Sequence, residues 1–139
     1  MVHHKGELQF PDNYTDTAIK KFLKDYFESS NTPNAHEETG SYFTENGVFC
    51  IEILALRERM WDSVPGREHR AHRIFPFQTN KETKNEEFMV YGTVTYKHHD
   101  GAHKDTGWGG RMELAKDHKS GQQKIAILHC FLVSALVKL

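Results

Sequence analysis

Three long β-type segments fill the last third of the chain, and they constrain the fold more than any other sequence feature. The segments run from 87 to 97, from 106 to 116 and from 124 to 137, and each is rich in aliphatic, aromatic or β-branched residues. The turn-rich stretches His99-Asp100-Gly101-Ala102 and His118-Lys119-Ser120-Gly121 separate them. Because such short connections join neighbouring antiparallel strands, the sequence predicts an antiparallel meander.

Helical spacing marks the first third of the chain. From Thr15 to Ser29 the apolar residues recur every three or four positions, which predicts an amphipathic helix. Asn34 followed by Glu37 resembles a capping box, so a second helix is expected from there to Phe43. Asn46-Gly47 would end this helix. The two helices would form a helical hairpin.

The middle of the chain carries a less regular pattern. Val48 to Ile53 predicts a strand, and Leu54 to Val64 returns to a helix-like spacing that Pro65-Gly66 closes. Arg67 to Phe77 fits a helix or a strand, but alternation before Pro76 favours a strand. In a regular strand, one face would carry Arg70, His72 and Ile74, and the other Ala71, Arg73 and Phe75.

Length and composition are those of one domain. The 139 residues, 37% hydrophobic and 12% aromatic, suffice for one core, so we expect a single domain over 1–139 with a tail at 1–12. The net charge of -1, from 18 basic and 19 acidic side chains, argues against nucleic acid and anionic membranes as partners. Neither a signal peptide nor a run of about 20 apolar residues is present. Cys50 and Cys130 lie in apolar runs, which favours buried thiols in a cytoplasmic protein.

The order of these elements resembles that of the nuclear transport factor two-like (SnoaL-like) superfamily over roughly residues 15–135. The phrases Tyr42 to Phe49, Gly92 to Tyr96 and Asp105 to Arg111 are similar to local patterns of that family. The resemblance implies an α+β fold, a cone-shaped curved antiparallel sheet wrapped by about three helices around a small-molecule pocket. Members it resembles include ketosteroid isomerase, scytalone dehydratase, polyketide cyclases and small fungal isomerases of secondary metabolism.

Two candidate catalytic residues follow from the resemblance to ketosteroid isomerase. Tyr26 falls where that enzyme places its oxyanion-stabilising tyrosine, although its helical spacing equally fits core packing. Glu52 falls near the catalytic base, and a carboxyl facing a dry cavity would be suited to proton transfer. A solvent-facing strand residue is the alternative reading of Glu52.

Two histidines complete the predicted acid–base set. His72 resembles the histidine that begins a central strand in scytalone dehydratase, and imidazole can donate or accept a proton near neutral pH. The neighbouring Arg70 and Arg73 leave open a surface position for it. His129 interrupts an apolar run, so its burial would require a hydrogen-bond partner or a ligand.

The candidate substrate-binding residues are Trp108, Tyr91, Tyr42 and Arg111. The aromatic rings could supply flat apolar walls, although they could also pack in the core or at a dimer face. Arg111 could anchor an anion, but an ion pair with Glu113 on the same strand face is the simpler account.

The sequence therefore predicts a cofactor-independent and metal-free isomerase, cyclase or dehydratase (a lyase) that transfers protons in a hydrophobic pocket. By resemblance, the reaction would belong to fungal secondary-metabolite biosynthesis. The alternative is a non-catalytic ligand-binding or dimeric interaction module of the same fold. We expect His72 to share one cavity with at least one of Tyr26, His129 and Glu52. We also expect a homodimer through the outer sheet face, because the strands carry apolar residues on both faces.

Overall fold

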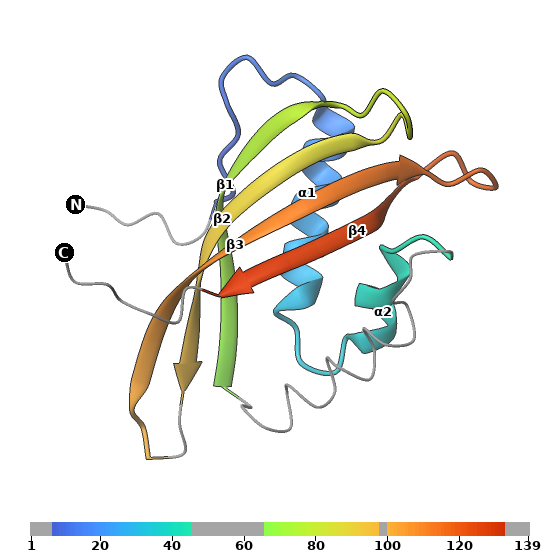
Figure 1. Cartoon of the computed structure of the whole chain (residues 1–139). Helices are drawn as coiled ribbons and strands as arrows, with labels where there is room; N and C mark the ends of the chain where they lie inside the picture. The colour runs from blue at the N-terminus through green and yellow to red at the C-terminus, as the bar shows by residue number, and fades with distance from the viewer. Residues whose placement is uncertain (1–6, 46–65, 98–99, 133–139) are drawn as a thin grey trace.

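The computed structural model describes residues 7–45, 66–97 and 100–132, with the backbone alone at 67, 131 and 132. Within these ranges the chain is an α+β fold of two helices and a four-stranded antiparallel sheet (Figure 1). The strand order β1-β2-β3-β4 confirms the predicted meander. The elements are α1 (Thr17–Ser30), α2 (His36–Ser41), β1 (Gly66–Thr79), β2 (Glu86–Lys97), β3 (His103–Lys116) and β4 (Gln123–Leu132).

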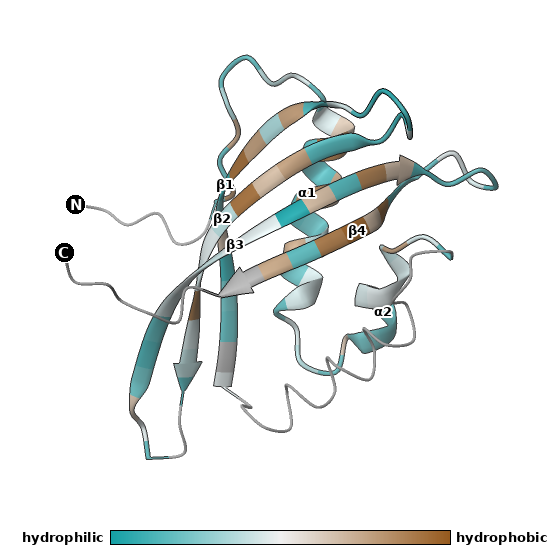
Figure 2. Ribbon diagram, in the orientation of Figure 1, coloured by the Kyte–Doolittle hydropathy of each residue, from teal (hydrophilic) through white to brown (hydrophobic). Residues whose placement is uncertain are grey.

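The core lies between α1 and one face of the sheet, which we call the inner face. Ile19, Leu23 and Tyr26 of α1 pack in one cluster with buried sheet residues such as Val90 and Met112. The hydrophobic stretches of the strands lie side by side where the sheet crosses α1, whereas the far end of the β2–β3 hairpin is more hydrophilic (Figure 2). Burial of each large apolar side chain contributes about 1.5–3 kcal/mol, so this contact stabilises the two layers against each other.

The helices differ in detail from their predicted bounds. α1 begins as expected, because the Asp16 carboxylate accepts a hydrogen bond from the Ile19 backbone N–H at 3.0 Å. The predicted Asn34 cap is wrong: Asn34 has a left-handed φ of 64°, and the cap residue of α2 is Ala35, without a side-chain hydrogen bond. α2 ends at Ser41, two residues early, because the chain then pairs with β4 through a bridge between Phe43 and Ile125.

The sheet has three register irregularities, two in β1 and one in β4, and two of them bear on the predicted site residues. In β1 the pairing with β2 shifts between Ala71 and Arg73, so that Ala71 and Ile74 both lie on the inner face. In β4 the pairing with β3 shifts after Ile125, which inserts Ala126 into the strand. An extra residue in a strand moves the following side chains to the opposite face.

Residues 7–10, expected in a terminal tail, contact the sheet. Gln9 donates its backbone N–H to the His72 carbonyl at 2.9 Å and accepts from the Ile74 N–H at 3.0 Å. Leu8 and Phe10 pack against the core on either side of Gln9. This segment therefore extends the sheet beside β1.

Other predictions concern residues that lie outside the described ranges or near their ends. The predicted strand at 48–53 and helix at 54–64 lie outside the described residues, as does the end of the last strand after 132. Cys130 is exposed rather than buried, because it lies near the end of β4 at the edge of the sheet. No helix in the described ranges has the length and apolar character needed to cross a bilayer.

Candidate functional site

The Trp108 indole is buried in the core on the inner face of the sheet. A Cβ atom on Gly92 would lie 2.7 Å from the indole, and one on Gly110 would lie 3.4 Å from it, so the ring lies across two glycines of neighbouring strands. The indole Nε1 donates to the Thr93 backbone carbonyl at 3.1 Å. The ring edge is thereby fixed, and the residue is only 4% exposed. A side chain at Gly92 would collide with the indole, whereas one at Gly110 would first meet a Val90 methyl group at 2.9 Å.

His69 lies beside Trp108, where α1 and β1 are joined. Its ring makes an edge contact with the indole, with the ring centroids 5.9 Å apart, and the residue is half-buried. The side chain of Asn31, at the end of α1, accepts from the His69 backbone N–H at 2.8 Å and donates to its carbonyl. Phe27 of α1 packs against the same indole at 6.0 Å. Asn31 therefore fixes the backbone of β1 at His69, whose ring lies beside the Trp108 indole.

Tyr26 and Tyr42 belong to an aromatic cluster adjoining the Trp108 indole. The Tyr26 ring contacts Phe27 at 5.1 Å, Tyr42 at 5.7 Å and Phe43 at 5.8 Å, and the residue is buried. Burial raises the pKa of Tyr42, and the carboxylate of Asp25 adds to the rise. Through Phe27, this aromatic cluster is continuous with Trp108 in the packed core.

The two predicted histidines lie elsewhere, on the outer face of the sheet. His72 is the residue without a β2 partner at the irregularity in β1. Its Nε2 is 2.8 Å from Thr93 Oγ1, and its ring is 6.0 Å from that of Tyr91. His129 is exposed and pairs with Arg111 across β3 and β4, after the irregularity in β4. The structure therefore does not bring His72 or His129 together with Tyr26.

The remaining predicted residues divide between the outer face and the undescribed segment. Tyr91 and Arg111 lie on the outer face, and Glu52 lies outside the described residues. Sequence reasoning missed His69 as an acid–base candidate, because regular alternation from the buried Ile74 places His72 inside. The irregularity in β1 reverses that assignment, and no turn residue in the sequence marks it.

A charged cluster occupies the outer face of β2 and β3. The expected ion pair forms: Arg111 Nη2 lies 3.2 Å from the Glu113 carboxylate and 3.4 Å from that of Glu87. Glu113 is only 3% exposed, and its burial, together with a hydrogen bond to Glu87, raises its pKa. Asn80 donates to Glu87 at 2.9 Å, which lowers the Glu87 pKa.

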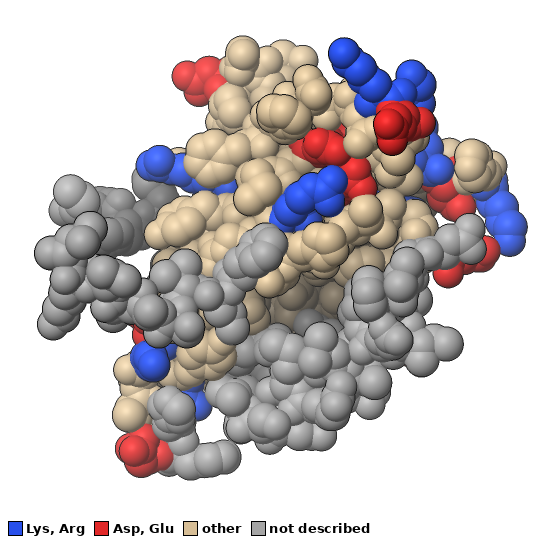
Figure 3. All heavy atoms as spheres, viewed as in Figure 1, with Lys and Arg blue, Asp and Glu red and all other residues tan. Residues whose placement is uncertain are grey.

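Large hydrophobic side chains surround this cluster. Phe75, Met89, Arg111 and His129 lie in one row across the four strands, and Tyr91 lies in the next row. Phe75 and Tyr91 are 50% exposed and Met89 is 43% exposed. In the view of this face, uncharged atoms surround a small group of basic and acidic side chains (Figure 3).

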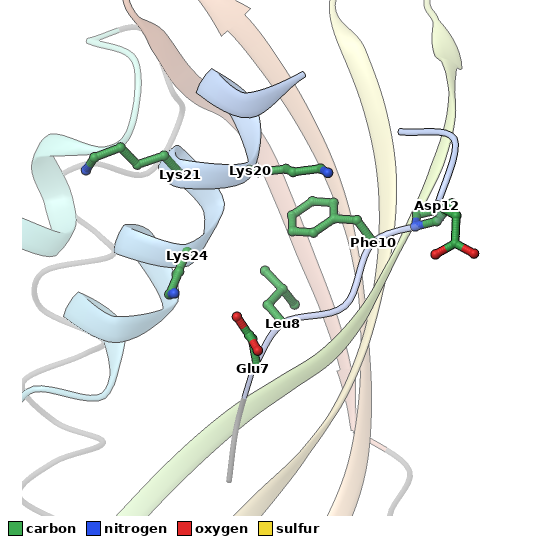
Figure 4. A pocket seen from close by; sticks show the side chains of 8 residues that line it. Glu7, Leu8, Phe10, Asp12, Lys20, Lys21 and Lys24 are labelled. Atoms are coloured by element: carbon green, nitrogen blue, oxygen red, sulfur yellow. The ribbon is translucent and has the colours of Figure 1, made fainter. Parts of the chain in front are cut away.

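A groove of about 620 Å³ runs between residues 7–12 and α1. Lys20 reaches over the Phe10 ring at 5.6 Å, whereas Lys21 points away from the groove toward Asp25, with which it forms an ion pair (Figure 4). The lining also includes Lys24, Glu7 and Asp12, so three lysines stand against two acidic residues. None of the predicted site residues lines this groove.

No family model and no curated protein matches the sequence. Several solved structures share its fold. Aln2 from a Streptomyces species gives a TM-score of 0.69 at 13% identity, over 89% of this chain and 94% of that chain. A Catenulispora acidiphila protein solved in complex with S-DNPA gives a TM-score of 0.67 at 15% identity. The match covers 83% of this chain and 90% of that chain.

A Xanthomonas campestris protein, described as a calcium/calmodulin-dependent protein kinase II association domain, gives a TM-score of 0.70 at 12% identity. The match covers 96% of this chain and 99% of that chain. At these identities the likeness concerns the fold, and it agrees with the helices, the meander and the sheet order described above. The chain therefore has the nuclear transport factor two-like fold, the fold of the SnoaL-like proteins.

Proposed function

We propose that this chain binds a small, mainly apolar molecule against the inner face of the sheet and catalyses a proton transfer. The reaction would be a cofactor-independent isomerisation, cyclisation or dehydration of a polyketide- or terpenoid-like intermediate in cytoplasmic secondary metabolism. The observation that carries the proposal is the half-buried His69, held by Asn31 and lying 5.9 Å from the Trp108 ring.

The chemistry requires a proton acceptor beside an apolar wall. Histidine is the side chain whose ordinary titration range spans neutral pH, so it can take a proton from a carbon next to a carbonyl and return it elsewhere. Trp108 and Phe27 would contact the ring system of the substrate and exclude water. We assign to the Tyr26 hydroxyl the role of donor to the developing enolate, the role its position in α1 suggested.

Comparison with other proteins supports ligand binding by this fold. The Catenulispora acidiphila structure that resembles this chain was solved with a bound small molecule, S-DNPA. A comparable ligand in this chain would contact the half-buried rings of His69 and Phe27, which pack against the buried Trp108 indole.

A general carbon acid can test this proposal without knowledge of the natural substrate. Nitrobenzisoxazole opens to a coloured phenolate when a base removes its ring proton, and an apolar site with a base accelerates the step. We expect His69→Asn to lower the rate by at least about 10²-fold, the usual scale for a positioned base. His72→Asn, three residues along the same strand but on the outer face, is the matched control and should retain the rate. Equal rates for the wild-type chain and His69→Asn would refute the assignment.

A second function is favoured by the outer face. Phe75, Met89 and Tyr91 expose large hydrophobic areas side by side, which is unusual for a surface that contacts only water. In the central cluster both Glu87 and Glu113 contact Arg111, so each charged side chain there would keep a partner of opposite charge when the face is covered. We therefore propose a second copy of this chain as the occupant of the outer face. In the alternative function, this dimer would be an interaction module, without catalysis.

A further inference from the structure

The outer face carries a cation without a counter-ion among the described residues. Arg73 of β1 pairs with Tyr91 of β2 and lies two positions before Phe75, so it belongs to the outer face. The residue is exposed, and it forms no ion pair with any residue that the structure describes. Its guanidinium therefore stands in solvent at the margin of the exposed hydrophobic side chains.

The charged cluster on the same face has the opposite imbalance. One guanidinium, that of Arg111, faces the two carboxylates of Glu87 and Glu113. The Glu87 side chain is 16% exposed and that of Glu113 is 4% exposed, so water compensates little of the second negative charge. Burial, and then the neighbouring Glu87 carboxyl, raises the pKa of Glu113, as expected where positive charge is insufficient. A second cation beside Glu87 would stabilise the fully ionised cluster.

Arg73 and the cluster lie on two sides of the hydrophobic patch. Arg73 is one row away from Phe75 and Met89 in one direction, and Glu87 is one row away from them in the other. Rows on one face are about 6.7 Å apart and neighbouring strands about 4.8 Å apart, so the backbones at Arg73 and Glu87 are separated by about 14 Å. This distance exceeds the combined reach of the two side chains, so they cannot form an ion pair within one chain.

A two-fold axis can bring these separated charges together. When a face packs against its own copy about an axis in the contact plane, each residue meets the one that lies equally far on the other side of the axis. We consider an axis that passes between Phe75 and Met89, at right angles to the line from Arg73 to Glu87. This axis places Arg73 of each copy against Glu87 of the partner subunit. The contact occurs twice, and the hydrophobic patches of the two copies meet at the axis.

We propose that two copies of this chain associate through the outer face about this axis, with Arg73 of each copy forming an ion pair with the partner's Glu87. This inference rests on the dimer proposed above and specifies its contacts. The face is self-complementary, because it carries a lone cation, a net negative cluster and a hydrophobic patch between them. A second copy is the partner that matches all three features at once.

Charge reversal tests the contact by sedimentation at micromolar concentration. Arg73→Glu sets two carboxylates against each other at each contact, and Glu87→Arg sets two guanidinium groups against each other. We expect each variant alone to weaken the dimer by at least about 10²-fold, about tenfold for each of the two contacts, and to sediment as a monomer. An equimolar mixture of the two variants should sediment as a heterodimer, because both contacts then join opposite charges.

Two further variants control for effects within the chain. Lys24→Glu makes the same charge change at an exposed position of α1, away from the outer face, and should stay dimeric. Arg73→Gln breaks no ion pair among the described residues, so it tests the contact even if Glu87→Arg does not fold. It should weaken the dimer by at least about tenfold. Circular dichroism of each variant shows whether the fold is retained.

The outcomes distinguish failure of this contact from failure of the proposed dimer. If the wild-type chain is dimeric and Arg73→Glu is equally dimeric, the contact is overturned and the dimer stands. The same conclusion follows if both charge reversals are folded monomers and their mixture stays monomeric. A monomeric wild-type chain would overturn the contact and the dimer together.

Discussion

Replacing Gly92 by alanine should destabilise the domain, because the inner wall depends on the space above this glycine. The added Cβ would lie 2.2 Å from the Arg70 carbonyl oxygen and 2.7 Å from the Trp108 indole. Real Cβ atoms essentially never approach other heavy atoms within 3.0 Å, so β1 or the indole must move. Because one obstacle is backbone and the other a buried ring, we expect the upper end of the range for overpacking, about 3 kcal/mol.

The measurement is thermal unfolding followed by circular dichroism and tryptophan fluorescence. For a domain of this size a loss of about 3 kcal/mol lowers Tm by roughly 10 °C. Gly109→Ala is the matched control, because its Cβ would meet only the Val90 carbonyl oxygen, at an ordinary 3.8 Å. That variant should stay within about 1 kcal/mol of the wild-type chain. Equal losses of stability in the two variants would refute the argument that the indole occupies space that only a glycine at position 92 leaves free.

Two further predictions concern the outer face. At micromolar concentration we expect the wild-type chain to sediment as a dimer and Met89→Glu as a monomer, because the new carboxylate would be buried without a partner. Lys84→Glu, in an exposed turn, should remain dimeric, and a monomeric wild-type chain would contradict the proposed interface. The raised pKa of Glu113 means that the folded chain retains a proton that the unfolded chain releases, so this group makes stability fall as pH rises above the ordinary range of a glutamate. In urea unfolding from pH 4 to 7, Glu113→Gln should remove this fall and be the more stable form at pH 7. Glu87→Gln should be less stable there, because the lowered pKa of Glu87 reflects a stabilised carboxylate; the opposite order would refute both assignments.

Periodicity alone was sufficient for most of the described fold. The amphipathic spacing of α1 and the turn-rich stretches of the meander are local signals, and the structure reproduces them within a few residues. The start of α2 was predicted less well, because Asn34 takes up a left-handed turn conformation that a capping sequence equally permits. Helix ends depend on a few side-chain contacts, whereas helix and strand type depends on many residues.

The candidate site was harder to predict because side-chain direction depends on strand register. Tyr26 and Trp108 lie on the inner side, since each belongs to an element with regular periodicity. His129 lies on the outer face because it follows the irregularity in β4, and His72, the unpaired residue at the irregularity in β1, lies there although Ile74, two positions on, is on the inner face. One extra residue reverses the face of every later side chain, and neither strand contains a glycine or proline that marks the position of the extra residue.

The two proposed functions use opposite faces of the same strand. His69 and His72 are three residues apart, and one contacts Trp108 on the inner face whereas the other contacts Thr93 on the outer face. Residues separated by three positions in a strand point to opposite faces, so this separation needs no irregularity. The irregularity instead allows His69 and the buried Ile74 to share the inner face, which in a regular strand would carry His72 with Ile74. Substitutions on the outer face should therefore change association without changing the groups proposed to handle protons, so binding and assembly can be tested separately in one chain.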